Sequence, residues 1–563
     1  EVVAPRYWSP EDPHLYELRV CVTRRGTNVD CFRTSTGIRY LHVDPNRGLF
    51  LNGKPLRIFG AGLHHDLGAL GAAFNYPAAK RRLNLLKSMG VNAIRTAHNP
   101  PAPELLELCD QLGLLVMDEI FDCWETGKST FDYARFFSEW AERDTRDWVR
   151  RDRNHPSIIL WSAGNEIPNP SVETASNLKR WIVEEDPTRP VTWARDGMDY
   201  EPYQTITDHV FDVAGYNYPS PALLDSLHQK FPNWIAFGSE TMSGRMSRGI
   251  YVFPAEQRNF KTTPDWGSSF DNCTSRQAMG HDADYQTYVN RPYLLGEFIW
   301  LGIDHLGENE WPLKSYNAGK IDSAGFPKQA YYIYQTRRTT QPMLHLLPHW
   351  NWASQGNYFY TDPNPGTDYV PLLQTRIPDA FTIPVTAYSN VDEVELFLNG
   401  QSHGKRQCGA TSTEPCRWQV PWAPGTLRAI GRIAGVEVTA DQVSTAGPAA
   451  KLDLTSDRAE ITANTDDRVF IATEVRDDAG VPVPDASHLI RFDVNGPGAI
   501  IAVDNGDPSD TDEPYQAAQR RAFDGKCLAI LRATGVGRIA VTASSAGLTS
   551  GGVTIESRAV ARN

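Results

Sequence analysis

Residues 158–166 read IILWSAGNE, a short apolar run that ends in Asn165 and Glu166. Such a run is typical of a strand that is buried on both faces of a parallel sheet. Similar runs lie on either side of it, and they begin at Leu56, Asn92, Leu114, Pro190, Val213, Trp234 and Tyr293. Helical segments such as AAKRRLNLLKSMG (78–90) separate most of these runs. Eight strands that alternate with helices over about 300 residues predict a (β/α)8 TIM barrel.

An open, doubly wound sheet is the alternative arrangement of the same elements. That fold would favour a glycine-rich phosphate loop after the first strand, with the spacing G-x-G-x-x-G. The segment GAGLHHDLGALG (60–71) does not have this spacing. The barrel is therefore the favoured fold.

The chain outside the barrel changes character twice. Residues 1–40 alternate like strands and are expected to be the last strands of an immunoglobulin-like β-sandwich whose N-terminal part is absent. Residues 41–345 form the expected barrel. After about residue 346 helical periodicity disappears, and short strands recur between Gly, Pro and Asp turns. We expect an immunoglobulin-like sandwich at 346–445 and a second sandwich at 446–563.

Composition excludes two classes of partner. The net charge is −13, and no Lys/Arg cluster offers the basic face that a nucleic acid needs. The sequence contains no run of about 18 apolar residues, which is the length needed to span a membrane. The chain has 15 Trp, 22 Tyr and 22 Phe, which suit either a core or the flat apolar faces that bind pyranose rings.

The eight cysteines contain no C-x-x-C pair, so a zinc or thioredoxin-type site has no support. Cys21 and Cys31 are equidistant from Gly26, and Cys408 and Cys416 are equidistant from Ser412. In a hairpin this spacing places each pair opposite one another, where a disulfide can form. The ordinary alternative is free cysteines that serve as small apolar strand residues. Bridged pairs would favour a periplasmic or secreted protein over a cytoplasmic one, and the compartment is otherwise open.

Polar residues at the C-terminal ends of barrel strands line the active site of this fold. Those at the expected ends are His64, His65, Asp66, Arg95, His98, Asp118, Glu119, Asp122, Asn165, Glu166, Tyr216, Asn217, Tyr218, Glu240, Glu297 and Trp300. Adjacent side chains on a strand point to opposite faces. We therefore expect one of His64 and His65 to lie in the pocket and the other to pack in the interior, and we prefer this interpretation to a metal cluster.

Glu166 and Glu240 form the expected catalytic pair. Acetal hydrolysis requires one carboxyl group that protonates the leaving oxygen and one that traps or stabilises the sugar cation. Asn165 can hydrogen-bond a sugar hydroxyl, and Arg95 can hold Glu240 ionised. The alternative is that both glutamates are buried structural acids paired with arginine.

Two segments resemble the signatures of the family 2 glycoside hydrolases. NAIRTAHNP (92–100), continuing to ELCDQLG (107–113), resembles the first signature, and DRNHPSIILWSAGNE (152–166) resembles the second. GSETMSGRMSRGIY (238–251) and GEFIWLGIDHLGE (296–308) resemble the bacterial β-galactosidase branch of that family.

The resemblance implies a retaining mechanism with Glu166 as acid/base and Glu240 as nucleophile. It implies that Tyr218 hydrogen-bonds the nucleophile, that His98 contacts the sugar, and that Trp300 forms the floor beneath it. Arg95, Asn165 and His64 also match substrate-binding positions. The residues after Glu240 are Thr241, Met242 and Ser243, which depart from the large β-galactosidases, so no obligatory metal and no cofactor are expected.

The expected function is the removal of terminal β-D-galactosyl residues from an oligosaccharide or glycoside. A β-glucuronidase, a β-mannosidase or an α-L-arabinopyranosidase side activity stays open within the same chemistry. A catalytically silent carbohydrate-binding protein is the alternative from another class, and loss of either glutamate would have favoured it. The sequence leaves open whether the protein is a homodimer.

Overall fold

The computed structural model of the protein describes residues 2–196, 201–253, 255, 262–263, 267–271, 279–309, 311, 313–352, 358–361, 370–371, 373–376, 381–408 and 415–560. The chain forms two compact units. One comprises Glu1–His65, Val91–Ser243 and Asp284–Leu301, and the other comprises Asp66–Gly90, Gly244–Ala283 and Gly302–Asn563.

The first unit contains a closed barrel of parallel strands. In order around the barrel they are β6 (Ile58–Leu63), β7 (Ala93–Thr96), β8 (Leu115–Glu119), β9 (Ile158–Asn165), β10 (Val191–Asp196), β11 (Val213–Asn217), β12 (Ala236–Thr241) and β15 (Leu294–Ile299). The last strand pairs with the first and closes the ring. Each of the eight apolar runs contains one of these strands, so the predicted barrel is confirmed and the doubly wound sheet is excluded.

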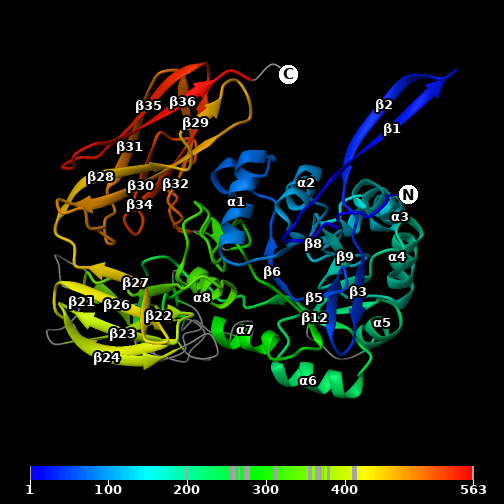
Figure 1. Ribbon diagram of the computed structural model, residues 1–563, viewed down its shortest axis with the longest axis horizontal. Coiled ribbons are helices and arrows are strands. Elements are labelled where there is room, and N and C mark those ends of the chain that lie inside the picture. The colour runs from blue at the N-terminus through cyan, green and yellow to red at the C-terminus, as the bar shows by residue number, and fades with distance from the viewer. Residues whose placement is uncertain are drawn as a thin grey trace. The chain divides into compact units, whose positions relative to one another are not determined.

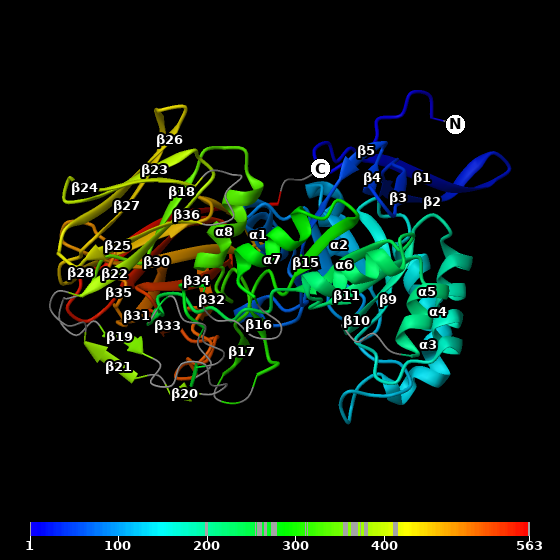
Figure 2. The ribbon, with the colours of Figure 1, turned by 90° about the horizontal axis from the view of Figure 1, so that it is seen from below.

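Helices of the same unit run along the outside of the strands (Figures 1 and 2). They are α2 (Pro103–Leu112), α3 (Ala134–Asp152), α4 (Val172–Glu185), α5 (Tyr203–His209) and α6 (Pro221–Lys230). Ser171 and Ser220 cap the starts of α4 and α6 by accepting hydrogen bonds from backbone N–H groups. Gly113 ends α2 at a φ of 71°, a left-handed conformation that glycine adopts readily. These caps at helix starts and ends determine where the chain leaves each helix and returns to the barrel.

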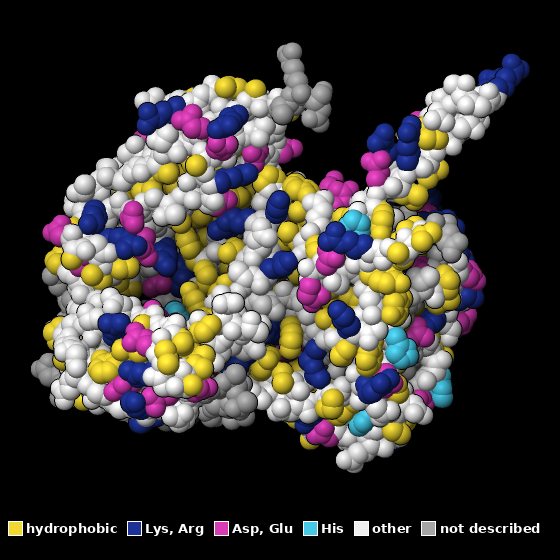
Figure 3. All heavy atoms as spheres, in the orientation of Figure 1, with side chains coloured by type: hydrophobic (Ala, Val, Ile, Leu, Met, Phe, Trp, Pro, Cys, Tyr) yellow, Lys and Arg dark blue, Asp and Glu magenta, His cyan; other side chains and the backbone are white. Residues whose placement is uncertain are grey.

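An antiparallel hairpin precedes the barrel, formed by β1 (Tyr16–Arg24) and β2 (Thr27–Thr36). Cys21 lies opposite Cys31, and the two are joined by a disulfide. The hairpin stands away from the rest of its unit, with Lys/Arg side chains at its tip (Figure 3). Its apolar side chains are largely solvent-exposed, with Val22 at 65% and Phe32 at 68%. A small sheet of β3 (Leu41–Asp44), β4 (Gly48–Leu51) and β5 (Lys54–Leu56) links the hairpin to β6.

The second unit contains two β-sandwiches. In the first sandwich, a three-stranded sheet packs on a four-stranded one. The three-stranded sheet has the order β18 (Leu344–Leu347), β22 (Thr382–Ser389), β25 (Cys416–Pro421), and the four-stranded sheet has the order β24 (Gln401–Gln407), β23 (Glu393–Leu398), β26 (Thr426–Ile433), β27 (Val436–Ser444). In the second sandwich, a four-stranded sheet packs on a five-stranded one. The four-stranded sheet has the order β28 (Ala449–Ser456), β30 (Val469–Asp477), β34 (Lys526–Ala533), β32 (Gly498–Asp504), and the five-stranded sheet has the order β29 (Glu460–Thr462), β36 (Gly551–Arg558), β35 (Gly537–Ser544), β31 (Leu489–Asn495), β33 (Gln519–Arg521). A barrel with flanking sandwiches is thus the observed fold class, while the exact domain boundaries 1–40, 41–345, 346–445 and 446–563 remain predictions.

The remaining elements are helices and short strands that belong neither to the closed barrel nor to the sandwich sheets. They are η1 (Gly68–Leu70), α1 (Tyr76–Ser88), β13 (Val252–Phe253), β14 (Thr262–Thr263), α7 (His281–Val289), β16 (His305–Leu306), β17 (Ser315–Tyr316), α8 (Gln329–Arg338), β19 (Tyr358–Thr361), β20 (Val370–Pro371) and β21 (Leu373–Arg376). Among the residues that the structure describes, no helix combines the length and the apolar character needed to cross a membrane.

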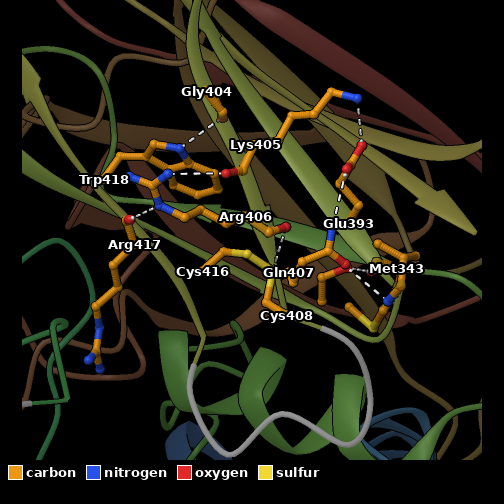
Figure 4. The surroundings of a disulfide bond; sticks show 12 residues. Met343, Glu393, Gly404, Lys405, Arg406, Gln407, Cys408, Cys416, Arg417 and Trp418 are labelled. Atoms are coloured by element: carbon orange, nitrogen blue, oxygen red, sulfur yellow. Dashed lines mark hydrogen bonds and ion pairs between the residues drawn. A yellow bond between two sulfur atoms is a disulfide. The ribbon is translucent and has the colours of Figure 1, made fainter. Parts of the chain in front are cut away.

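A second disulfide joins Cys408, just after β24, to Cys416 at the start of β25 (Figure 4). Beside it, Trp418 donates its indole N–H to the backbone oxygen of Gly404 at 3.1 Å. Both cysteines belong to the core of the first sandwich. The alternative of free cysteines is therefore wrong for these two pairs. Cys109, Cys123 and Cys527 are free and buried, and Cys273 lies outside the described residues.

Candidate active site

The predicted catalytic side chains gather at the C-terminal end of the barrel strands. Glu240 lies in β12, and Glu166 directly follows β9. Glu166, Tyr218 and Met242 each come immediately after a strand and have φ values of 42°, 53° and 49°. Non-glycine residues rarely adopt this left-handed conformation, and such residues cluster at functional sites. The backbone thus turns sharply at the end of three strands of the barrel.

Glu240 is held by two hydrogen-bond donors. Arg95, in β7, donates from Nη1 to Oε1 at 2.6 Å, and Tyr218 donates its hydroxyl to Oε2 at 2.8 Å. The side chain of Glu240 is 5% exposed. Its carboxylate is therefore fixed by one donor on each oxygen, and the predicted contact with Arg95 is present.

Arg95 is completely buried and bridges several acceptors. Besides Glu240 it donates to both carboxylate oxygens of Glu119 at 2.8 and 3.0 Å, and to Oδ1 of Asn165 at 2.8 Å. Burial opposes the charge of Arg95, but Glu119 and Glu240 outweigh it and raise its pKa. Arg95 is thus held as a cation between two carboxylates.

Glu119, the last residue of β8, is the buried counter-ion of this network. Ser162 donates its hydroxyl to Oε2 at 2.7 Å, and Nδ1 of His98 lies 2.8 Å from Oε1. Burial alone would raise the pKa of the Glu119 carboxyl, but Arg95 and His98 lower it below its ordinary value. The network fixes the orientation of Arg95 and hence of Glu240.

Glu166 has a different environment from Glu240. Asn217, at the end of β11, donates from Nδ2 to Oε1 of Glu166 at 3.0 Å. Burial raises the pKa of the Glu166 carboxyl, and the nearby charge of Glu240 raises it further, against the hydrogen bond from Asn217. Such a carboxyl keeps its proton to a higher pH than an ordinary glutamate.

Asn165 connects the two carboxyl groups. Its Oδ1 accepts from Arg95 and also from Asn217 at 3.1 Å, while its Nδ2 donates to Asp122 at 3.1 Å. Lys128 donates to Asp122 at 2.7 Å and to the backbone oxygen of Asn165 at 3.0 Å. Both ends of the Asn165 amide are therefore oriented.

Three aromatic rings lie beside the carboxyl pair. His98 stacks on Trp300 with ring centroids 5.2 Å apart and planes 10° from parallel. His64 forms T-shaped pairs with both rings, with its ring centroid 5.6 Å from that of His98 and 5.4 Å from that of Trp300. His65 is exposed, so the expectation that it packs in the interior is wrong.

A cavity of about 460 Å³ adjoins this cluster and has His98 in its wall. Ile120, Phe121, Tyr133 and Trp148 give it a largely apolar lining. The cavity shares His98 and Asp122 with the hydrogen-bond network described above, whereas Glu166 and Glu240 are not among its lining residues.

The structure brings together all eight predicted site residues: His64, Arg95, His98, Asn165, Glu166, Tyr218, Glu240 and Trp300. Glu119 and Asn217 lie at predicted strand ends to which the sequence assigns no role, and no sequence pattern points to Ser239. The signal for Glu119 is the acidic pair Asp118 and Glu119, which ends an otherwise apolar strand.

Models of known families match most of the chain. "Glycosyl hydrolases family 2, TIM barrel domain" matches residues 44–310, and "Glycosyl hydrolases family 2" matches 1–39. "Glycoside hydrolase family 2 C-terminal domain 5" matches 452–554, and a domain of unknown function matches 381–439.

Individual relatives agree with these matches. The chain is 36% identical to the β-galactosidase BoGH2A of Bacteroides ovatus, over 97% of this chain and 67% of that protein. It is 32% identical to a putative β-glucuronidase of Formosa agariphila, over 95% of this chain and 51% of that protein. The crystal structure of a β-glycosidase from Bacteroides vulgatus superposes with a TM-score of 0.87 at 34% identity, covering 98% of this chain and 70% of that one.

The chain thus spans two thirds of the first of these relatives and about half of the second. The site contains the paired carboxyl groups that glycoside hydrolysis requires. The protein is therefore a member of the family 2 glycoside hydrolases, enzymes that hydrolyse O-glycosyl bonds.

Proposed function

We propose that the protein is a retaining exo-glycosidase that removes terminal β-D-galactosyl residues. The observation that supports it most is the contrast between the two carboxyl groups. Glu240 accepts from a guanidinium and a phenol, while burial and the charge of Glu240 raise the pKa of Glu166. One group is thereby suited to attack and the other to proton donation.

In the first step Glu240 attacks the anomeric carbon and forms a covalent glycosyl ester. Glu166 gives its proton to the glycosidic oxygen as the bond to the leaving group breaks. In the second step the ionised Glu166 takes a proton from water, which attacks the anomeric carbon and releases Glu240. The sugar leaves with its original configuration because it has been inverted twice.

The neighbouring side chains have supporting roles in this proposal. Asn165, His64 and His98 bind sugar hydroxyls, and Trp300 forms an apolar floor beneath the ring. Arg95 is 0% exposed, so it acts through Glu240 instead of touching the sugar.

Galactose is favoured over glucuronic acid on two grounds. The β-galactosidase BoGH2A is the more similar of the two curated relatives described above, at 36% against 32% identity. A glucuronide also needs a cation for its carboxylate, whereas Arg95 and Lys128 already pair with carboxylates. The similarity to a putative β-glucuronidase makes glucuronide the second candidate substrate.

The test is a panel of nitrophenyl glycosides: β-galactoside, β-glucuronide, β-mannoside, β-glucoside and α-L-arabinopyranoside. The proposal expects a dominant β-galactoside signal that Glu240→Gln abolishes and that exposed Glu173→Gln, in the first turn of α4, leaves intact. Azide should restore part of the Glu240→Gln activity and yield a glycosyl azide of inverted configuration. Dominant hydrolysis of the β-glucuronide would change the proposed substrate to a glucuronide. No hydrolysis of any glycoside in the panel would favour a carbohydrate-binding protein.

The mechanism has its own test. Glu166→Ala should slow substrates with poor leaving groups far more than activated aryl glycosides, because only the former need the proton. The first product seen by NMR should be the β-anomer of galactose. Equal losses on both substrate types, or an α-anomer, would reject this assignment of Glu166 and Glu240.

A periplasmic or secreted location is part of the proposal, supported by the two disulfides. Fractionation of the native host would test it, with activity in the extracytoplasmic fraction as the expected result.

A further inference from the structure

Asn217 is a buried amide beside the carboxyl group of Glu166, and it is 0% exposed. Its Nδ2 donates to Oε1 of Glu166 at 3.0 Å and to Oδ1 of Asn165 at 3.1 Å. Its Oδ1 accepts the hydroxyl proton of Ser239 at 2.7 Å. The side chain cannot reach a substrate directly, so any part it plays is exerted through Glu166 or Asn165.

The orientation of this amide is determined by its partners. An amide nitrogen has two protons and no acceptor, and both protons have oxygen partners here. A half-turn of the amide would place Oδ1 against the oxygens of Glu166 and Asn165. It would also remove the acceptor of the Ser239 hydroxyl. The observed orientation is therefore the one that satisfies all four groups.

Ser239 occupies its position because of an irregularity in the barrel. Tyr216 in β11 pairs with Gly238 in β12, but the next residue, Asn217, pairs with Glu240. The strand β12 therefore carries one extra residue, Ser239, opposite β11. Bulges of this kind re-aim side chains and are common beside active sites. Here the extra residue presents its hydroxyl to Asn217.

The amide restricts where the proton of Glu166 can reside. Oε1 of Glu166 faces a group that can only donate, so Oε1 must accept whether the carboxyl is neutral or ionised. In a neutral carboxyl the carbonyl oxygen is a better acceptor than the hydroxyl oxygen, so this donor favours Oε1 as the carbonyl and Oε2 as the oxygen that carries the proton. A carboxyl without this donor could place its proton on either oxygen.

We propose that Asn217, oriented by Ser239, is a positioning residue that keeps the catalytic proton of Glu166 on Oε2. This inference rests on the proposed role of Glu166 as the acid/base. The same hydrogen bond also stabilises the ionised carboxylate and so lowers the pKa of Glu166 against burial and the charge of Glu240. Asn217 thus influences both the place of the proton and the pH at which it is lost.

The test uses Asn217→Leu, which keeps the size of the side chain and removes the donor, and the milder Ser239→Ala. For Asn217→Leu, kcat/KM on a β-galactoside with an alkyl leaving group should fall about 100-fold, but on the 2,4-dinitrophenyl glycoside less than about 5-fold. The basic limb of the pH profile should move up by about one unit. Ser239→Ala should show the same pattern with smaller changes.

Asn92→Leu is the matched control. Asn92 precedes β7, bonds the backbone of Phe59 and Arg57, and lies at the opposite end of the barrel strands. Any loss that it causes through reduced stability should be equal on both substrates, with an unmoved basic limb. The same behaviour in Asn217→Leu would overturn the inference, because it would indicate a structural role alone.

Glu166→Ala separates this inference from the proposed function. If that variant shows no dependence on the leaving group, the acid/base assignment itself fails. If it shows the dependence and Asn217→Leu does not, only the inference fails.

Discussion

Tyr218 and Glu240 are joined twice: the Tyr218 hydroxyl donates to Oε2 of Glu240 at 2.8 Å, and the Tyr218 backbone N–H donates to the Glu240 backbone oxygen at 2.7 Å. The backbone contact fixes the start of the tyrosine side chain, and the hydroxyl contact fixes its end. The proposed nucleophile thus has a donor whose position is determined by the barrel itself.

Tyr218→Phe removes the hydroxyl contact and keeps the backbone one. A hydrogen bond to a carboxylate contributes about 1.5–3 kcal/mol, so kcat is expected to fall about 10- to 100-fold. Tyr293→Phe is the control, because Tyr293 donates to Asp225 at the same 2.8 Å in the same unit. Equal activity of the two variants would show that the Tyr218 hydroxyl has no catalytic part.

Removal of Glu119 should leave the buried cation Arg95 with only one of its two carboxylate partners, Glu240. Arg95 and Glu119 are both 0% exposed, and breaking a buried pair by deleting one member costs about 3–5 kcal/mol. Because Arg95 keeps Glu240 as a partner, Glu119→Ala is expected to lower the free energy of unfolding by up to that amount in denaturant titrations. Glu119→Gln, which keeps one acceptor oxygen for Arg95 and an amide group that can donate to the Ser162 hydroxyl oxygen, should lose less. A Glu119→Ala protein as stable as the parent would contradict this account of the network.

Glu166 is predicted to reduce stability at neutral pH. Its pKa is higher in the folded protein, through burial and then the charge of Glu240, than in the unfolded chain, where it is about 4.3. The fold therefore has its full stability below the unfolded pKa and loses part of it as the pH rises through the folded pKa. Glu166→Gln should unfold at a higher temperature than the parent at pH 7 and at a similar temperature at pH 4. Calorimetry at the two pH values checks the sign.

The disulfides predict a thiol count. With Cys21–Cys31 and Cys408–Cys416 bridged, denatured protein should react with four fewer equivalents of a thiol reagent before reduction than after it. Replacing Cys408 and Cys416 together by alanine should lower stability by about 2–3 kcal/mol, because the bridge closes a short loop. Equal counts before and after reduction would show that neither bridge forms.

The strands of the barrel were predictable because each is buried on both faces and therefore apolar along its length. The strand ends were predictable because a charged residue is costly inside such an apolar run. Glu166 and Glu240 could therefore be recognised as residues at strand ends. Partners across strands were not predictable. Asn217 meets Ser239 through a one-residue shift between β11 and β12, and nothing in either strand's composition encodes that shift.

Glu119 shows the same limit within one strand. Asp118 and Glu119 follow each other in β8, and alternation places them on opposite faces. The sequence does not say which face meets Arg95. That choice depends on the packing of the neighbouring strands, which the structure resolves in favour of Glu119.

The left-handed backbone at Glu166, Tyr218 and Met242 has a consequence for selection. Each such residue costs about 1 kcal/mol or more, which glycine would not incur. At Glu166 the raised pKa of the carboxyl adds to this cost at neutral pH, so a screen for heat resistance alone would enrich Glu166→Gly, which removes the proposed acid/base. Stability and activity are in competition at this position, so laboratory evolution of a hardier enzyme needs selection for turnover in every round.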